Sequence, residues 1–228
     1  MVKKLQRMQE IGREDYMEQI IIVEGVSKSY KGVKVLNNIC VSFERGKING
    51  IIGRNGSGKT MLIKAICGLV EPDEGQITVN HKVIGKDVDF PENTGVIIET
   101  PGFLPPLSAY NNLAYLASLK NIIGKEEICR AMTLVGLDPK EKKHVGKYSL
   151  GMKQRLGLAQ AIMEKPDILI LDEPMNGLDK KGVLEVRDIL LKFQSEKKTI
   201  LLVSHNPDDI NTLCENIYEM DSGEIVRL

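Results

Sequence analysis

Eight residues early in the chain carry the pattern best suited to chemistry. Their order is Gly53, Arg54, Asn55, Gly56, Ser57, Gly58, Lys59, Thr60. Glycines let a backbone wrap closely around phosphate groups, whose negative charge is met by backbone N–H groups and by a helix N-terminus. In such a loop the lysine reaches the outer phosphates and the hydroxyl beside it binds Mg²⁺. The segment therefore predicts a site for ATP and its magnesium ion.

The surroundings of this loop strengthen the prediction. An apolar run, Ile48–Ile52, precedes it, and a helical pattern, Met61–Leu69, follows it. A Walker A loop requires this position between a strand and a helix. The alternative is a glycine-rich turn with an exposed lysine, which would need no such context.

Two carboxylates end a second buried run about a hundred residues later. Asp172 and Glu173 directly follow Ile168–Leu171. Asp172 is expected to hold Mg²⁺ through water, because this ion gives up its hydration reluctantly. Glu173 is then available to orient and deprotonate the attacking water, as a general base does. The alternative is a strand end with two solvated acids.

The remaining pattern predicts the elements that position these residues. Short apolar runs alternate with helical patterns, as in an α/β fold with a parallel sheet. The apolar runs are Ile48–Ile52, Val96–Ile98, Ile168–Leu171 and Ile200–Val203. The helical patterns are Met61–Leu69, Asn111–Lys120, Met152–Met163 and Val183–Phe193. Two regions depart from this alternation. Ile20–Glu44 is typical of short strands with turns, and Pro101–Leu150 of helices without strands. Asp221, Ser222 and Gly223 indicate a hairpin within Ile217–Val226.

Composition narrows the class of protein and its partners. Lys plus Arg and Asp plus Glu each number 31, so the overall charge does not favour nucleic acid as a partner. No apolar stretch approaches the ~20 residues of a membrane span, and no secretory signal is visible. We therefore expect a cytoplasmic protein. The four cysteines form no Cys-x-x-Cys pair and are expected to be reduced packing residues.

The first nineteen residues carry mixed charge without a regular apolar pattern. We expect residues 1–19 to be a flexible leader, and residues 20–228 to form a single domain. Met17 stands just before the first expected strand, so either Met1 or Met17 could be the start of translation.

One further segment places the chain in a family. Tyr148, Ser149, Leu150, Gly151 and Met152 resemble the Leu-Ser-Gly-Gly-Gln signature of ATP-binding cassette (ABC) proteins, with Ser149 and Gly151 retained. The resemblance implies that these two residues contact ATP held by another cassette. The alternative is that Ser149 only caps a helix.

Three weaker marks agree with this resemblance in order and spacing. Tyr30 stands where the family stacks an aromatic ring on adenine; Asn176–Asp179 is similar to the D-loop, with Asp179 at the nucleotide; and Ser204-His205 is similar to the segment with the switch histidine. The alternatives are a core tyrosine and a surface histidine. The resemblance implies a P-loop, RecA-like core with a mainly parallel sheet, a small antiparallel β lobe, and a helical lobe inserted at about residues 100–157. It also assigns hydrolysis to Glu173 together with His205.

Glu99 departs from the family pattern, because a glutamine is usual at its position. A carboxylate can still bind Mg²⁺ or hold the water, but it adds negative charge beside Asp172 and Glu173. The alternative is that Glu99 points to solvent while Pro101 and Gly102 shape the loop.

The segments from Ile98 to Phe103, from Leu107 to Leu113 and from Ser149 to Leu156 are similar to the branch that includes bacitracin- and lantibiotic-export ATPases. The resemblance implies an ATPase that works as a pair of cassettes, either two copies or a copy and a paralogue. It implies separate transmembrane permease subunits and a location on the inner face of the cell membrane. Two alternatives stay open: a soluble cassette ATPase acting on ribosomes, DNA or iron–sulfur assembly, and a regulatory subunit that binds ATP without useful turnover.

Overall fold

The computed structural model describes residues 18–99 and 102–228. The first strand, β1, begins at Gln19, one residue before the expected start of the domain. The rest of the expected leader, residues 1–17, lies outside the described residues, as do Thr100 and Pro101.

A six-stranded sheet forms the centre of the molecule. Its order is β10-β9-β3-β8-β7-β6, from the strands β3 (Ile48–Ile52), β6 (Thr94–Ile97), β7 (Ile168–Asp172), β8 (Thr199–Val203), β9 (Asn216–Asp221) and β10 (Glu224–Arg227). All neighbouring pairs are parallel except β9 and β10. These two form the predicted hairpin, and Ser222 and Gly223 have φ of 50° and 81°, the positive values that a two-residue hairpin turn needs.

Both faces of this sheet are buried, which explains the apolar runs. Ile168 and Ile170 of β7 face one core, and Leu169 and Leu171 face the other, since successive side chains of a strand point to opposite faces. Helix α2 (Lys59–Ile66) packs on the first face, and α6 (Lys180–Ser195) and α7 (Pro207–Leu213) cover the second. The strand ends that carry the chemical motifs are thereby held by a core on each side.

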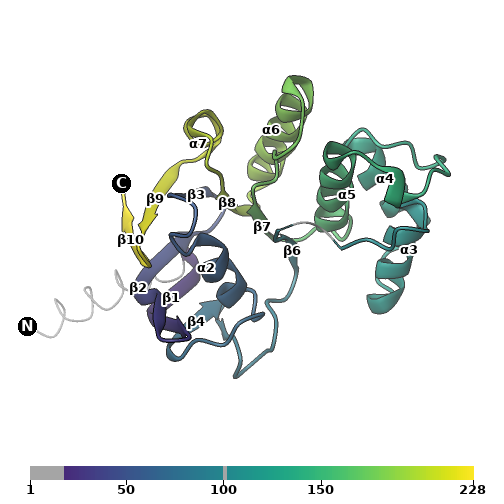
Figure 1. Cartoon of the computed structure of the whole chain (residues 1–228). Helices are drawn as coiled ribbons and strands as arrows, with labels where there is room; N and C mark the ends of the chain where they lie inside the picture. The colour runs from purple at the N-terminus through teal and green to yellow at the C-terminus, as the bar shows by residue number, and fades with distance from the viewer. Residues whose placement is uncertain (1–17, 100–101) are drawn as a thin grey trace, which may run out of the picture.

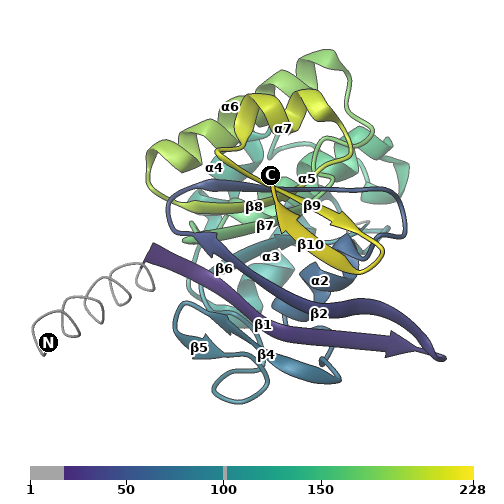
Figure 2. The same cartoon turned by 90° about the vertical axis from the view of Figure 1, so that its left-hand side faces the viewer.

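A second sheet of four antiparallel strands packs over α2 (Figure 2). Its order is β2-β1-β4-β5, from β1 (Gln19–Tyr30), β2 (Val33–Glu44), β4 (Glu74–Val79) and β5 (Lys82–Val83). The prediction of short strands was wrong here, because β1 and β2 each run for 12 residues. Their pairing contains register shifts, one of them between Val23 and Val26, so an irregular apolar pattern still belongs to continuous strands.

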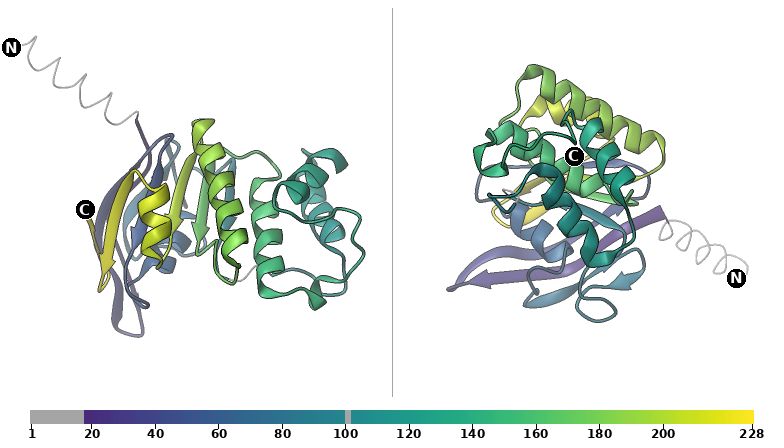
Figure 3. Two further views of the ribbon diagram at one scale, coloured as in Figure 1. Left: turned by 90° about the horizontal axis from the view of Figure 1, so that it is seen from above. Right: turned by 90° about the vertical axis from the view of Figure 1, so that its right-hand side faces the viewer.

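Three helices lie beyond β6 and β7, away from the antiparallel sheet (Figures 1 and 3). They are α3 (Ala109–Lys120), α4 (Lys125–Leu134) and α5 (Leu150–Ile162), with a short 3₁₀ turn at Val145–Lys147. Leu156 and Ala159 of α5 are fully buried and join these helices to the core under the six-stranded sheet. Together with the two sheets, these helices confirm the predicted fold class. None of the helices in the described ranges is long and apolar enough to cross a membrane.

The cysteines follow the prediction only in part. Burial raises the pKa of the Cys67 and Cys214 thiols to about 12, as expected for thiols that pack rather than react. Cys40 is exposed, so its prediction as a packing residue was wrong. It lies on β2 with its side chain outside the core.

Candidate functional site

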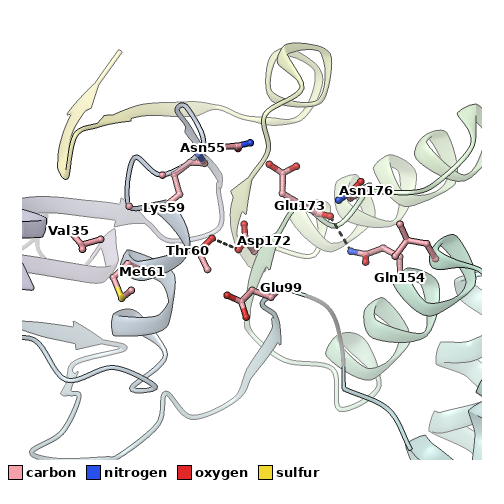
Figure 4. A pocket seen from close by; sticks show the side chains of 13 residues that line it. Val35, Asn55, Lys59, Thr60, Met61, Glu99, Gln154, Asp172, Glu173 and Asn176 are labelled. Atoms are coloured by element: carbon pink, nitrogen blue, oxygen red, sulfur yellow. Dashed lines mark hydrogen bonds between the residues drawn. The ribbon is translucent and has the colours of Figure 1, made fainter. Parts of the chain in front are cut away.

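A cleft of about 510 Å³ opens where β3 and β7 end and α2 begins. Figure 4 shows the side chains that line it, with Lys59 and Thr60 on one wall and Glu99, Asp172 and Glu173 facing them. Parallel strands bring their carboxyl ends to one edge of a sheet, and binding sites of open α/β sheets lie outside that edge. The fold therefore gathers the two chemical motifs into one site.

The loop before α2 needs glycine at two positions for lack of space. Gly53 and Gly58 have φ of 149° and 110°. A Cβ on Gly53 would lie 2.1 Å from the carbonyl oxygen of Met220, and one on Gly58 would lie 2.8 Å from that of Val35. The loop can therefore take this shape only with glycine at these positions, which leaves its backbone open toward the cleft.

Lys59 lies folded inside this loop. Its Nζ donates hydrogen bonds to the carbonyl oxygens of Gly53 at 2.7 Å and Arg54 at 2.8 Å. Burial lowers the pKa of Lys59, and the nearby charges of Glu173 and Asp172 act against that shift. The Ser57 hydroxyl is buried and has no hydrogen-bond partner in the described part of the chain. A buried cation, an unpartnered hydroxyl and the start of a helix fit a bound phosphate chain.

Asp172 and Thr60 form the part of the site suited to a magnesium ion. The Thr60 hydroxyl donates to Oδ2 of Asp172 at 2.8 Å, and Asp172 is buried (Figure 4). Burial raises the pKa of Asp172, and the Thr60 hydrogen bond and the charge of Lys59 act against that shift. Across residues 18–99 and 102–228, no three His, Cys, Asp or Glu side chains are grouped to hold a metal. The pair fits an ion such as Mg²⁺, which keeps waters and takes further oxygens from phosphates.

Glu173 adopts a strained backbone conformation beside this pair. Its φ is 52°, unusual for a residue other than glycine. Its N–H donates to the carbonyl of Val203 at 2.9 Å, and its own carbonyl accepts a bond from Nε2 of Gln154 at 3.1 Å. His205 Nδ1 lies 2.8 Å from Oε1 of the Glu173 carboxylate. The structure thus brings together the two residues that the sequence analysis assigned to hydrolysis.

Glu99 lines the cleft but contacts a residue that the sequence analysis did not consider. Its Oε1 accepts a hydrogen bond from Nζ of Lys64 at 2.6 Å, and its side chain is 62% exposed. Lys64 lies four residues after Thr60, on the same face of α2. Glu99 also contributes to the raised pKa of Asp172, and Lys64 acts against it. The added acid therefore reaches the site as one half of an ion pair.

This pair leads to a prediction about magnesium. Glu99→Gln should raise the Mg²⁺ concentration for half-maximal ATPase by about two- to fivefold, because an exposed charge is worth less than about 1 kcal/mol. Lys64→Met should lower that concentration, since Glu99 then faces the cleft without its partner. Magnesium titrations of both variants and of the unchanged protein test this. Superimposable curves would mean that Glu99 acts only through the shape of its loop.

Tyr30 lies at the end of β1, outside the residues that line the cleft. Its side chain is 43% exposed and Lys28 Nζ lies 5.6 Å from the centre of its ring. It is therefore not a core tyrosine, and a free aromatic face can stack on a base.

A truncation measures the contribution of that face. Tyr30→Ala should weaken ATP binding by about 1–3 kcal/mol, the range for base–aromatic stacking, and Tyr30→Phe should not. Tyr115→Ala is a matched control, because Tyr115 is also exposed and lies on α3. Calorimetry with ATP and GTP should show similar losses, since stacking does not read base edges. Unchanged affinity in Tyr30→Ala would remove Tyr30 from the site.

Three predicted residues lie near the cleft but not among the side chains that line it. Ser149 caps α5 by accepting a bond from the Met152 N–H, and its side chain is exposed. Asp179 caps α6 in the same way through the Gly182 N–H. Gly151 packs against the next loop, where a Cβ would lie 2.8 Å from the Gly177 carbonyl oxygen. Within one copy, capping is thus the visible role of Ser149 and Asp179.

Two residues that hold parts of the site, Gln154 and Lys64, were not predicted from the sequence. Gln154 of α5 is 6% exposed, and its side chain donates a hydrogen bond to the Glu173 carbonyl. Lys64 pairs with Glu99. The signal for Gln154 was a polar residue about one turn into an apolar helix face, and the signal for Lys64 was its spacing from Thr60.

A glycine-rich loop between β3 and α2, a buried lysine within it, and an acid pair at the end of β7 define a P-loop nucleotide-binding protein. Comparison with known proteins narrows the class. The sequence profile described as ABC transporter matches residues 36–176. The chain belongs to the ABC transporter family, as its ATP-binding subunit, an ATPase coupled to transport.

Curated relatives confirm the predicted resemblance. The chain is 46% identical over 206 residues to the uncharacterized ABC transporter ATP-binding protein YybJ of Bacillus subtilis, covering 90% of this chain and 94% of that protein. It is 40% identical to the bacitracin transport ATP-binding protein BcrA of Enterococcus faecalis, covering 92% and 69%. It is 36% identical to the lantibiotic transport ATP-binding protein SrtF of Streptococcus pyogenes, covering 90% and 88%.

Solved structures agree with the fold. The dimeric post-hydrolysis structure of the ATP-binding cassette MJ0796 with ADP and Pi superimposes with a TM-score of 0.82 at 22% identity, over 91% of this chain and 97% of that one. The cbiO1 protein of Clostridium perfringens, described as part of the ABC transporter complex cbiONQ, gives 0.76 at 27% identity, over 92% and 87%.

Proposed function

We propose that this protein powers an exporter of a peptide antibiotic, a lantibiotic or another drug, and that it works as a pair of cassettes bound to separate transmembrane subunits. The placement of Ser149 and Gly151 supports the pair. They lie beside the cleft but outside its lining, and the hydroxyl of Ser149 is exposed. A second copy, arranged head to tail, would bring them to the ATP held by Lys59 of the first. The MJ0796 cassette is described as dimeric, which supports a pair.

The side chains of the cleft have separate roles in this proposal. Lys59 would exchange the carbonyls of Gly53 and Arg54 for the outer phosphates of ATP. Thr60 and Asp172 would hold Mg²⁺, which offsets phosphate charge when it is bound. Glu173 would orient the attacking water and accept its proton, and His205 would hold the Glu173 carboxylate at the distance seen here.

Two adjoining grooves with exposed apolar side chains support a membrane partner. They measure about 660 and 260 Å³ and share Thr94 and Val96 of β6, the strand that leads to Glu99. Large apolar side chains line them and are more than half exposed, namely Leu69, Phe90, Leu119 and Ile122. Exposed apolar surface of this kind is typical of a protein contact. We assign it to the transmembrane subunit, which would hold the protein on the inner, cytoplasmic face of the membrane.

The cargo is proposed from the names of BcrA and SrtF, which are described as bacitracin and lantibiotic transport proteins. The test is co-expression of the chain with candidate transmembrane subunits from the same organism, in a host sensitive to bacitracin and lantibiotics. The unchanged chain should raise the inhibitory concentration of one of these compounds, and Glu173→Gln should not. Equal sensitivity with both forms, despite a stable complex in the membrane, would remove these compounds as cargo. Failure to associate with any membrane protein would favour the soluble cassette ATPase.

A further inference from the structure

A buried polar network lies under the loop that carries His205, between β8 and α7. Ser204 and Asp209 are each 2% exposed. The Ser204 hydroxyl donates to Oδ2 of Asp209 at 3.2 Å and accepts a bond from the Asn206 N–H at 3.1 Å. The Ser204 hydroxyl therefore connects the residue before His205 with Asn206, the residue after it, and with Asp209 of α7.

The charge of this network is balanced from another helix. Arg187 of α6 donates from Nε and Nη2 to Oδ1 of Asp209, at 3.0 and 2.6 Å. The Arg187 side chain is 16% exposed. Both bonds go to Oδ1, and Oδ2 accepts the bond from Ser204, so each oxygen of the buried carboxylate has a partner. Without Arg187, Asp209 would be left as a buried charge without a counterion.

His205 itself has little packing to hold it. Its side chain is 64% exposed, and its Nδ1 lies 2.8 Å from Oε1 of Glu173. The position of an exposed imidazole depends on its backbone, and that backbone is held on both sides by Ser204. Hydrogen bonds therefore connect Arg187 to Asp209 and Asp209 to Ser204, and His205, the next residue in the chain, lies against Glu173.

We propose that Arg187 is a positioning residue for hydrolysis: through Asp209 and Ser204 it holds His205 against the Glu173 carboxylate. This inference rests on the proposed role of Glu173 and His205. It adds three residues to the machinery, none of which lines the nucleotide cleft.

Kinetics of three variants test the proposal. Ser204→Ala removes the hydrogen bonds between Asp209 and the His205 loop and leaves the Arg187–Asp209 pair in place. Arg187→Met removes the guanidinium group. Arg187→Lys retains the positive charge but lacks the second nitrogen that donates to Asp209. Misplacement of a catalytic group costs up to about 100-fold, so kcat should fall by roughly 10- to 100-fold in the first two, and less in Arg187→Lys. The KM for ATP should stay within about twofold, because the network does not touch the phosphate loop.

Controls separate this role from simple stability. Ser195→Ala removes a hydroxyl that bonds the Lys192 carbonyl at the end of α6, and should leave kcat unchanged. If Arg187→Met does not fold, Ser204→Ala decides. Folded Ser204→Ala with unchanged kcat and KM would overturn the proposal.

A second readout does not depend on turnover. The chain has three histidines, so the ring nitrogen resonances of His205 can be assigned by comparison with His205→Ala. The proposal expects these resonances to move in Ser204→Ala and not in Ser195→Ala. If His205→Ala keeps full activity, the proposed role of His205 in hydrolysis fails, and the resonances still report whether Ser204 positions the ring. Unmoved resonances in Ser204→Ala would overturn the positioning itself.

Discussion

Glu173→Gln is expected to lower ATP hydrolysis by about 10²- to 10⁴-fold, the usual contribution of a general base. The amide keeps the shape of the side chain but cannot accept a proton from water. ATP binding should persist, because Lys59 and the phosphate loop are unchanged and the Glu173 backbone is held by Val203 and Gln154. Phosphate release and equilibrium binding of ATP, measured on the same preparation, test both halves of this prediction.

Glu196→Gln is the matched control, because Glu196 is exposed at the end of α6, away from the cleft. It should retain the turnover of the unchanged protein. Turnover near that level in Glu173→Gln would remove Glu173 from its role as base. Loss of ATP binding in the same variant would instead assign Glu173 to holding the nucleotide.

Lys59→Ala should weaken ATP binding by about 10- to 150-fold, corresponding to the 1.5–3 kcal/mol of hydrogen bonds to charged groups. In the structure the ammonium group already lies inside the loop, bonded to two carbonyl oxygens of that loop. Burial has lowered its pKa, and phosphate charge would favour its protonated form. The alanine side chain offers no cation to the phosphates, so the loss should fall on affinity.

Calorimetry with ATP and Mg²⁺ measures this loss, and Lys86→Ala, at an exposed loop position, is the control. The variant should remain folded, since the loop carbonyls it frees lie beside an open cleft. Equal affinity in Lys59→Ala and the unchanged protein would mean that the glycine loop holds phosphate through its backbone alone.

The motif-bearing elements could be predicted because their signals are local. The run Ile48–Ile52 coincides with β3, and the acids at the end of β7 stand where the sequence placed them. The strands of the antiparallel sheet were harder to predict, because bulges interrupt the alternation of apolar and polar residues in β1 while its pairing continues. Helix α7 spans seven residues, too few for a helical period to show.

Contacts between distant residues were the harder part of the site. The pairing of Lys64 with Glu99 depends on how α2 packs beside the end of β6, and that of Arg187 with Asp209 on the packing of α6 and α7. Neither packing follows from the spacing of residues within one helix. Ser149 illustrates the opposite case: its capping role follows from its own segment, and its proposed contact with ATP requires a second chain.

We propose that two chains enclose ATP between the phosphate loop of one and the Ser149 segment of the other. Sedimentation of Glu173→Gln with ATP and Mg²⁺ tests it most directly, because this variant should bind ATP without consuming it. We expect a species of two chains with two bound ATP molecules, which returns to single chains when ATP is replaced by ADP. A variant that binds ATP fully and still sediments as a single chain would contradict it.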